Sequence, residues 1–239
     1  MQRIYLENTD LSQENIRLKD KDLVHQLTKV LRVRIWEEIS LFDGVNNFDI
    51  SFKIIELWKR EITLERICDH ENNSEINFEL SLYNALPNKL EKIEYIIQKG
   101  TEIGFTQFNF FRTDRSQKLV ISDNKLIRLE KIITEATEQS GRAIIPKINI
   151  SDDFDINNLP DGKNIFFHTQ NDNSQDLKSI EKTAWENINL FVWPEGGWSE
   201  REVQILEKNT SRIHLGNRIL RTETTGIVTG FYIIQSLKK

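Results

Sequence analysis

Residues 189–209 read NLFVWPEGGWSEREVQILEKN and predict a strand, a glycine-rich loop and a helix in succession. Pro194 favours extended backbone in the residue before it, so we expect the apolar strand to end at Trp193. Ser199 and Glu202 have the spacing of a capping box, which marks the start of the helix. The two glycines between strand and helix fit either a tight turn or a loop whose bare backbone lies against a ligand.

The alternation of strand and helix runs through the chain from residue 78 onward. Short apolar strands are predicted at 78–86, 108–111, 164–168, 189–193 and 212–215. Helices are predicted at 88–103, 124–138, 174–186, 199–209 and 223–237. This order is typical of an α/β domain with a mostly parallel sheet and helices on both faces.

The first 70 residues have a different pattern. Apolar residues at helical spacing predict a helix over 22–32. Alternating apolar residues and turn signals then predict short strands at 39–42, 47–55 and 61–67. We therefore expect a small β-rich domain at 1–70, a polar linker within 69–75, and the α/β domain at 71–239.

Three loops are expected at one edge of the parallel sheet, because parallel strands end together and ligands bind where they end. These loops contain His168, the segment Pro194–Gly197 and the segment 215–221. Thr222 is placed to cap the last helix, and Glu223 lies near the positive end of that helix, where a carboxylate is favoured. The edge is a candidate binding site, although helix capping alone explains its acidic residue.

Composition restricts the class of protein. Hydrophobic residues make up 38% and charged residues 29% of the chain, as in a soluble globular protein, and no apolar run is long enough for a membrane helix. No secretory signal is visible, and the single cysteine, Cys68, indicates a reducing cytosolic compartment. The four histidines lack metal-ligand spacing, and phosphate-loop, dinucleotide-binding and nucleophile-elbow motifs are absent. We expect a cytoplasmic protein without a metal.

Charge is unevenly distributed around a net value of −5. Residues 17–34 contain six basic and two acidic side chains, and residues 212–221 contain three arginines and no acid. Residues 112–147 are also more basic than acidic. Such segments are either ordinary solvated faces or surfaces that bind the phosphates of a nucleic acid.

Six segments together resemble one family nearly from end to end. The chain is similar to RsmE-type ribosomal RNA methyltransferases of the SPOUT superfamily in HQLTKVLR (25–32), KLEKIEYIIQKGTEIGF (89–105), RTDRS (112–116), EATEQSGRAIIP (135–146), PEGGWSERE (194–202) and LGNRILRTET (215–224). The resemblance implies an N-terminal PUA-like RNA-binding β-barrel and a C-terminal domain with a trefoil knot. It also implies a homodimer that uses S-adenosylmethionine to methylate N-3 of a uridine in small-subunit (16S) ribosomal RNA, within a small-subunit particle.

The resemblance assigns roles to residues of the loops. Arg221 would stabilise negative charge on the uracil, since a guanidinium cannot act as the base, and Glu223 or Glu195 would accept the proton. The residues that bind the cofactor would be His168, Pro194, Glu195, Gly196, Gly197, Leu215, Gly216, Ile219 and Leu220. The residues that bind RNA would be Arg32, Lys99, Arg112, Arg115 and Arg142.

Three residues depart from the family pattern. Trp193 stands before the Pro-Glu-Gly-Gly motif and Trp36 follows the first arginine motif, each where glycine is usual, and Thr225 replaces an alanine. We expect Trp193 to pack beside the cofactor. Two other functions stay open, namely a non-catalytic RNA-binding factor in ribosome assembly and a SPOUT methyltransferase that acts on another RNA.

Overall fold

A computed structural model describes residues 1–152, 154–169, 175–177 and 186–237 of the chain. Contacts divide the chain into two compact units. The first comprises Met1–Glu75 with Thr137–Ile145, and the second comprises Ile76–Ala136 with Pro146–Lys239. The boundary expected at residue 70 falls inside strand β5 (Ile62–Glu71), which continues into the polar segment read as a linker.

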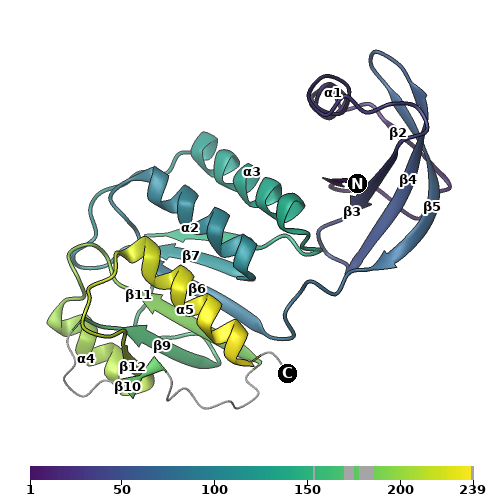
Figure 1. Cartoon of the computed structure of the whole chain (residues 1–239). Helices are drawn as coiled ribbons and strands as arrows, with labels where there is room; N and C mark the ends of the chain where they lie inside the picture. The colour runs from purple at the N-terminus through teal and green to yellow at the C-terminus, as the bar shows by residue number, and fades with distance from the viewer. Residues whose placement is uncertain (153, 170–174, 178–185, 238–239) are drawn as a thin grey trace. The chain divides into compact units, whose positions relative to one another are not determined.

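The first unit contains a five-stranded sheet in the order β1-β3-β4-β5-β2 (Figure 1). Its other strands are β1 (Gln2–Tyr5), β2 (Asn15–Leu18), β3 (Glu38–Phe42) and β4 (Phe48–Leu57). All its pairs are antiparallel except β1 with β3. The β-rich character is confirmed, whereas β1 and β2 escape prediction because 4 residues are too few for an alternating pattern to be distinguished from chance.

The helix predicted over 22–32 is present but is not a regular α-helix. It consists of α1 (Lys21–His25) and a π-helical turn, η1 (Gln26–Val30). Val24 and Leu27 are buried in the apolar core that the sheet of this unit forms. A π-helical turn needs a specific packing environment, and the 3.6-residue apolar spacing of the sequence does not reveal it.

The segment 137–145 belongs to the first unit through buried polar contacts. Arg142 is 3% exposed, and its guanidinium pairs with the carboxylate of Glu75 at 2.7 Å. The same carboxylate accepts the backbone N–H groups of Ala143 and Ile144. Removing one partner of such a buried pair strongly destabilises a fold, so this pair is part of the structural framework.

The second unit contains a seven-stranded sheet in the order β10-β12-β9-β11-β6-β7-β8. Its strands are β6 (Glu79–Ala85), β7 (Gln107–Phe111), β8 (Lys147–Ser151), β9 (Lys163–Phe167), β10 (Gln175–Asp176), β11 (Asn187–Val192) and β12 (Ser211–His214). Every strand pair among the described residues of this sheet is parallel. The predicted parallel sheet is confirmed, and β8 and β10 are additions to it.

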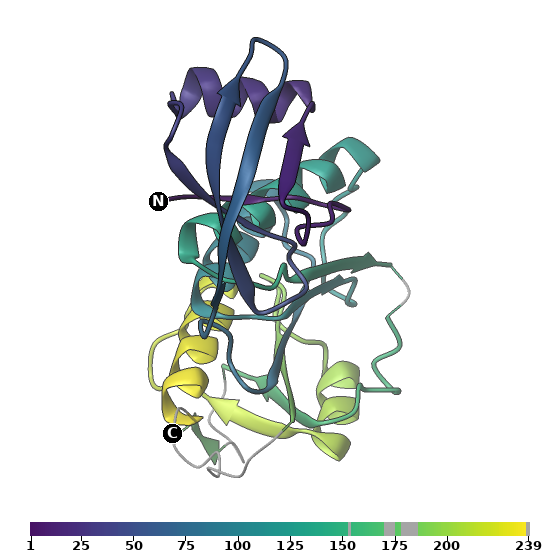
Figure 2. The same ribbon diagram turned by 90° about the vertical axis from the view of Figure 1, so that its right-hand side faces the viewer.

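Helices lie on both faces of this sheet, as predicted (Figures 1 and 2). They are α2 (Leu90–Ile103), α3 (Asp123–Ser140), α4 (Glu200–Asn209) and α5 (Thr222–Leu237). α2, α3 and α5 cover one face and α4 covers the other. α4 lies opposite α2 and α3 because its crossover from β11 to β12 runs in the other direction along the sheet, and right-handed crossovers then lie on the other face. No helix in the described ranges is long and apolar enough to cross a membrane.

The helix predicted over 174–186 is wrong for Gln175–Asp176. These two residues form β10, because they pair with β12 at the edge of the sheet. Residues 174 and 178–185 of that prediction lie outside the described part of the chain.

Candidate active site

The loop between β11 and α4 forms the turn and the helix start that the sequence predicts. The backbone N–H of Gly197 donates to the carbonyl oxygen of Pro194 at 2.8 Å, and Gly197 has a φ of 72°, which residues with a side chain seldom adopt. The hydroxyl of Ser199 accepts the backbone N–H of Glu202, whose carboxylate accepts the backbone N–H of Ser199. The capping box is therefore confirmed.

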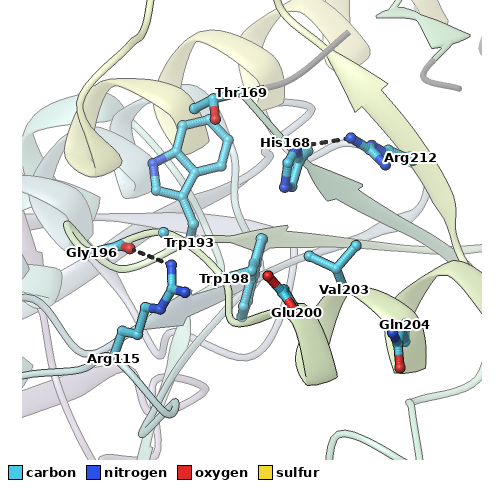
Figure 3. A pocket seen from close by; sticks show the side chains of 11 residues that line it. Arg115, His168, Thr169, Trp193, Gly196, Trp198, Glu200, Val203, Gln204 and Arg212 are labelled. Carbon is cyan, nitrogen blue, oxygen red and sulfur yellow. Dashed lines mark hydrogen bonds between the residues drawn. The ribbon is translucent and has the colours of Figure 1, made fainter. Parts of the chain in front are cut away.

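A cavity of about 510 Å³ opens beside this loop, where β9 and β11 end (Figure 3). Its walls combine two indoles with basic and polar side chains from several loops and from α4. The lining residues are Arg115, His168, Thr169, Trp193, Gly196, Gly197, Trp198, Glu200, Val203, Gln204 and Arg212. The two interpretations of the glycine pair are thus compatible, because the tight turn is one wall of a cavity.

Arg115 lies directly against Gly196. Its Nη1 donates to the carbonyl oxygen of Gly196 at 3.2 Å, and a Cβ on Gly196 would lie 3.1 Å from the Cβ of Arg115. Close approach of this second loop therefore favours glycine at 196. A Cβ on Gly197, by contrast, would have no atom within 4 Å, so Gly197 leaves open space beside the backbone.

Asp114 joins the same two loops. Its carboxylate accepts hydrogen bonds from Ser199 Oγ at 2.6 Å and from Arg201 Nη2 at 2.7 Å, and its backbone N–H donates to Glu202 at 2.9 Å. The hydrogen bond from Arg201, and next that from Ser199, holds the pKa of Asp114 below its ordinary value. The loop 112–116 and the start of α4 therefore form one connected structure, which no local pattern in the sequence predicts.

Glu195 does not contribute its side chain to the cavity. Its carboxylate accepts hydrogen bonds from Lys92 Nζ at 2.7 Å and from the backbone N–H of Asn88 at 3.1 Å. Burial raises the pKa of Glu195, but these hydrogen bonds outweigh burial and leave the pKa below its ordinary value. The structure therefore argues against Glu195 as a proton acceptor, because its ionised form is already engaged. Pro194 is not among the lining residues either.

His168 lines the cavity, and it has a basic neighbour. Its Nδ1 lies 3.0 Å from Nη2 of Arg212, whose Nη1 pairs with Glu207 at 2.6 Å. The sequence shows Arg212 only as one member of a basic segment. It does not place Arg212 beside His168, because that contact depends on the pairing of β12 with β9. The face of α4 that lines the cavity is easier to predict from the sequence, because its residues Glu200, Val203 and Gln204 have helical spacing.

The predicted residues of the loop 215–221 do not line this cavity. Ile219 is 78% exposed, and a Cβ on Gly216, whose φ is 89°, would have no atom within 4 Å. Leu215 and Leu220 are half-buried. The loop follows β12, at the same edge of the sheet, but its residues are not part of the lining of this cavity.

Arg221 and Glu223 lie at the start of α5. The side chain of Arg221 is 85% exposed, and its Nη1 lies 3.9 Å from the carboxylate of Glu223, which is 15% exposed. The Oε2 atom of Glu223 is buried without a hydrogen-bond partner. Thr222 is the first residue of α5 and so lies inside the helix, not at the cap position expected for it. Its hydroxyl donates to the carbonyl oxygen of Trp193 at 3.0 Å and so joins α5 to the end of β11.

The residues expected to bind RNA have different surroundings. The prediction that Arg142 binds RNA needs correction, because its guanidinium is buried on Glu75 and cannot meet a phosphate without breaking that pair. Arg112 pairs with Asp152, and Lys99 pairs with Glu102 at 2.7 Å. The remaining two, Arg32 and Arg115, are exposed.

No group of three or more His, Cys, Asp or Glu side chains that could hold a metal ion occurs within the described residues. The cavity is lined by two indoles, by basic and other side chains, and by the backbone of the glycine turn.

Comparison with known proteins gives consistent matches. A family model described as an RNA methyltransferase domain matches residues 74–233. The ribosomal RNA small subunit methyltransferase E of Buchnera aphidicola is 33% identical over 233 residues, covering 95% of this chain and 90% of that protein. The ribosomal RNA small subunit methyltransferase E 2 of Borreliella burgdorferi is 28% identical and covers 97% of this chain and 96% of its own length.

A solved structure agrees with these relatives. The ribosomal RNA small subunit methyltransferase E of Neisseria gonorrhoeae, bound to S-adenosylmethionine, has a TM-score of 0.84 and 28% identity to this chain. The match covers 99% of this chain and 98% of that one. The similarity therefore extends over both compact units.

Proposed function

This chain belongs to the RNA methyltransferase domain family, and we propose that it transfers a methyl group from S-adenosylmethionine to N-3 of a uridine in small-subunit ribosomal RNA. The match over nearly the whole chain to small-subunit ribosomal RNA methyltransferases is the observation that carries the proposal. The substrate is small-subunit ribosomal RNA within a particle, and the protein acts in the cytoplasm.

The cavity beside the glycine turn supports binding of the methyl donor. Its volume of about 510 Å³ lies within the range of small-molecule sites, roughly 300–1,000 Å³. The indoles of Trp193 and Trp198 offer flat apolar surface, and Gly197 leaves room beside the backbone. His168, Gly196 and Gly197 would hold the cofactor there. When bound, S-adenosylmethionine supplies an electrophilic methyl group.

Arg221 and Glu223 would have different roles in the reaction of the uridine. The exposed guanidinium of Arg221 stays protonated, so it stabilises negative charge that develops on the uracil oxygens. Glu223 accepts the proton from the ring nitrogen, and its unpartnered Oε2 supports this assignment. Glu195 is the weaker candidate, since Lys92 and Asn88 already occupy its carboxylate.

Contacts with RNA would come from exposed basic side chains in both units. Arg115 and Arg32 are exposed enough to meet phosphates, and Arg112 and Lys99 would have to exchange their present carboxylate partners. The net charge of −5 predicts modest affinity for naked RNA. A structured particle, which offers several contacts at once, is therefore the better substrate.

Three further features belong to the proposed function. The five-stranded sheet of the first unit is a PUA-like barrel, and the second unit is a SPOUT domain with a trefoil knot. The active protein is a homodimer, because Val228, Phe231 and Tyr232 leave an apolar stripe on α5 exposed. Light scattering on the purified protein checks the dimer, and a monomeric mass at micromolar concentration would contradict it.

Calorimetric titration with S-adenosylmethionine tests the enzyme assignment. A saturable heat at millimolar ligand or below supports it. The absence of heat, together with an unchanged melting temperature, would favour a non-catalytic assembly factor. Mass mapping of RNA from a strain that lacks the protein then shows whether the missing methyl group lies in small-subunit ribosomal RNA or in another RNA.

Replacing Arg221 by Ala should lower turnover by about 100-fold, as expected when a group that stabilises developing charge is removed. Cofactor affinity should change little, because the Arg221 side chain lies outside the cavity wall. Turnover and calorimetry on the same variant separate the two effects. Unchanged turnover would remove Arg221 from its assigned role.

A further inference from the structure

Trp36 has a backbone conformation that bulky residues seldom adopt. Residues 34–37 form a turn closed by a hydrogen bond from the backbone N–H of Glu37 to the carbonyl oxygen of Arg34 at 3.1 Å. Trp36 is the third residue of this turn and has a φ of 72°, the position and sign for which type II turns take glycine. Strain of this kind persists where the surrounding structure imposes it, often because the side chain is needed.

The strained turn is held in place by hydrogen bonds of the backbone and of the Glu37 carboxylate, none of which involves the indole. The backbone N–H of Trp36 donates to the carbonyl oxygen of Ile54 in β4 at 2.8 Å, and the N–H of Ile54 donates back to Glu37 at 3.0 Å. The carboxylate of Glu37 also accepts the backbone N–H of Arg34 at 2.9 Å. The turn would therefore form with glycine at position 36, and it would form with less strain.

Packing does not explain the indole. The Trp36 side chain is 65% exposed, and the neighbouring Ile35 is 46% exposed. The ammonium of Lys53 lies 5.4 Å from the centre of the Trp36 ring, within the range of a cation–π contact. The indole is thus positioned at the surface beside a cation.

Exposed basic residues also occur in the segment of sequence that leads to Trp36. Lys29, Arg32 and Arg34 are exposed, and Arg32 also has a positive φ of 54°. The acid of the turn, Glu37, is occupied by a backbone N–H. An exposed aromatic ring with a cation beside it and further exposed cations in the same segment is a combination that binds single-stranded nucleic acid, since bases stack on the ring and phosphates meet the cations.

We propose that Trp36 stacks on an unpaired base of single-stranded RNA, while Arg32 and Arg34 contact the adjoining phosphates. The inference rests on the proposed function, in which RNA is the substrate, and adds a base-contacting residue in the first unit. A protein partner for the same indole is the competing explanation, and the experiments below separate the two.

The test uses fluorescence anisotropy with a labelled oligouridylate of about ten nucleotides, long enough to fill a typical single-strand site. Trp36→Ala should bind about 5- to 10-fold more weakly than the unmodified protein, and Trp36→Phe should retain most of the affinity. Phe48→Ala is the matched control, because Phe48 is an aromatic residue of the same unit that is 49% exposed, and its neighbours Asn47 and Asp49 are not basic. Equal affinity of Trp36→Ala and the unmodified protein, or an equal loss in Phe48→Ala, would overturn the proposal.

An abasic oligomer of the same length separates stacking from charge. It should bind the unmodified protein and Trp36→Ala equally, because it offers phosphates and no base. Arg34→Ala should reduce the salt dependence of oligouridylate binding, and Trp36→Ala should leave that dependence unchanged. An affinity for the abasic oligomer that still depends on Trp36 would contradict base stacking.

The Trp36→Gly variant tests whether the indole has only a structural role. Glycine suits a φ of 72°, so this variant should melt at a higher temperature while it loses RNA affinity like Trp36→Ala. A lower melting temperature would mean that the indole serves the fold, and the proposal would fail. Calorimetry with S-adenosylmethionine on the same variants keeps the two proposals apart, since cofactor binding can fail while the oligouridylate result stands, or the reverse.

Discussion

Asp114 shows at the scale of single residues how the glycine turn is supported from outside. Its carboxylate binds Ser199 and Arg201, and the adjacent Arg115 binds the carbonyl oxygen of Gly196. The middle of the loop between β11 and α4 and the start of α4 are therefore held by one short segment after β7. A binding loop needs support of this kind, because a loop that must be ordered by its ligand binds it less tightly.

Replacing Asp114 by Asn should destabilise the protein at neutral pH and matter less in acid. The pKa of Asp114 is lowered in the folded protein, so its charged form stabilises the fold above the unfolded-state pKa of about 3.9, and this stabilisation is lost as pH falls through the folded-state pKa. Melting curves of both proteins at about pH 6 and about pH 3 check this. A difference in melting temperature that is the same at both pH values would contradict the linkage.

Trp193 is the residue for which the family pattern gives least guidance. Its indole is 7% exposed and lines the cavity. Trp193→Ala should lower the free energy of unfolding by about 3–5 kcal/mol, as for a buried large-to-small change, and should also weaken binding of S-adenosylmethionine. Urea unfolding and calorimetry measure the two effects. Tighter cofactor binding in the variant would mean that the indole obstructs the pocket.

At the scale of helices and strands, close packing over the sheet depends on two glycines. A Cβ on Gly230 of α5 would lie 2.5 Å from Phe105, and a Cβ on Gly100 of α2 would lie 2.4 Å from Phe108. Both rings are fully buried, so neither can move aside easily. The position of α5, and with it that of Arg221, therefore depends on the absence of side chains at these positions.

Gly230→Ala should lower the free energy of unfolding by about 1–3 kcal/mol through overpacking, even though alanine favours helices. Gln235→Ala is the control on the same helix, because Gln235 is exposed and polar, is not one of the apolar residues of the exposed stripe, and its loss should change stability little. Urea unfolding compares the two variants. Equal stability of Gly230→Ala and the unmodified protein would show that the helix shifts freely.

Prediction from the sequence succeeds where periodicity is strong and local. The long helices, the parallel strands and the capping box at Ser199 each have a pattern of their own. It fails for β1 and β2, which are too short, and for Gln175–Asp176, whose strand exists only through pairing with β12. Among the residues predicted to bind RNA, Arg142 cannot be told from an exposed arginine by sequence, and only the fold shows that it is buried in a pair with Glu75.

At the scale of the whole molecule, two compact units of different architecture occur in one chain, and relatives named as small-subunit ribosomal RNA methyltransferases match both of them. The second unit holds the cavity and the start of α5, and the first unit presents the exposed Trp36. With a net charge of −5, recognition by charge alone would be weak, and we propose that each unit contributes specific contacts.

Methyl transfer to small-subunit ribosomal RNA is measured most directly with S-adenosylmethionine that carries a labelled methyl group. Small ribosomal subunits from a strain that lacks the protein are incubated with the unmodified protein or with Arg221→Ala. We predict label at N-3 of one uridine in small-subunit ribosomal RNA with the unmodified protein, and about 100-fold slower labelling with the variant. No label in that RNA, from a protein that binds the cofactor, would contradict the claim.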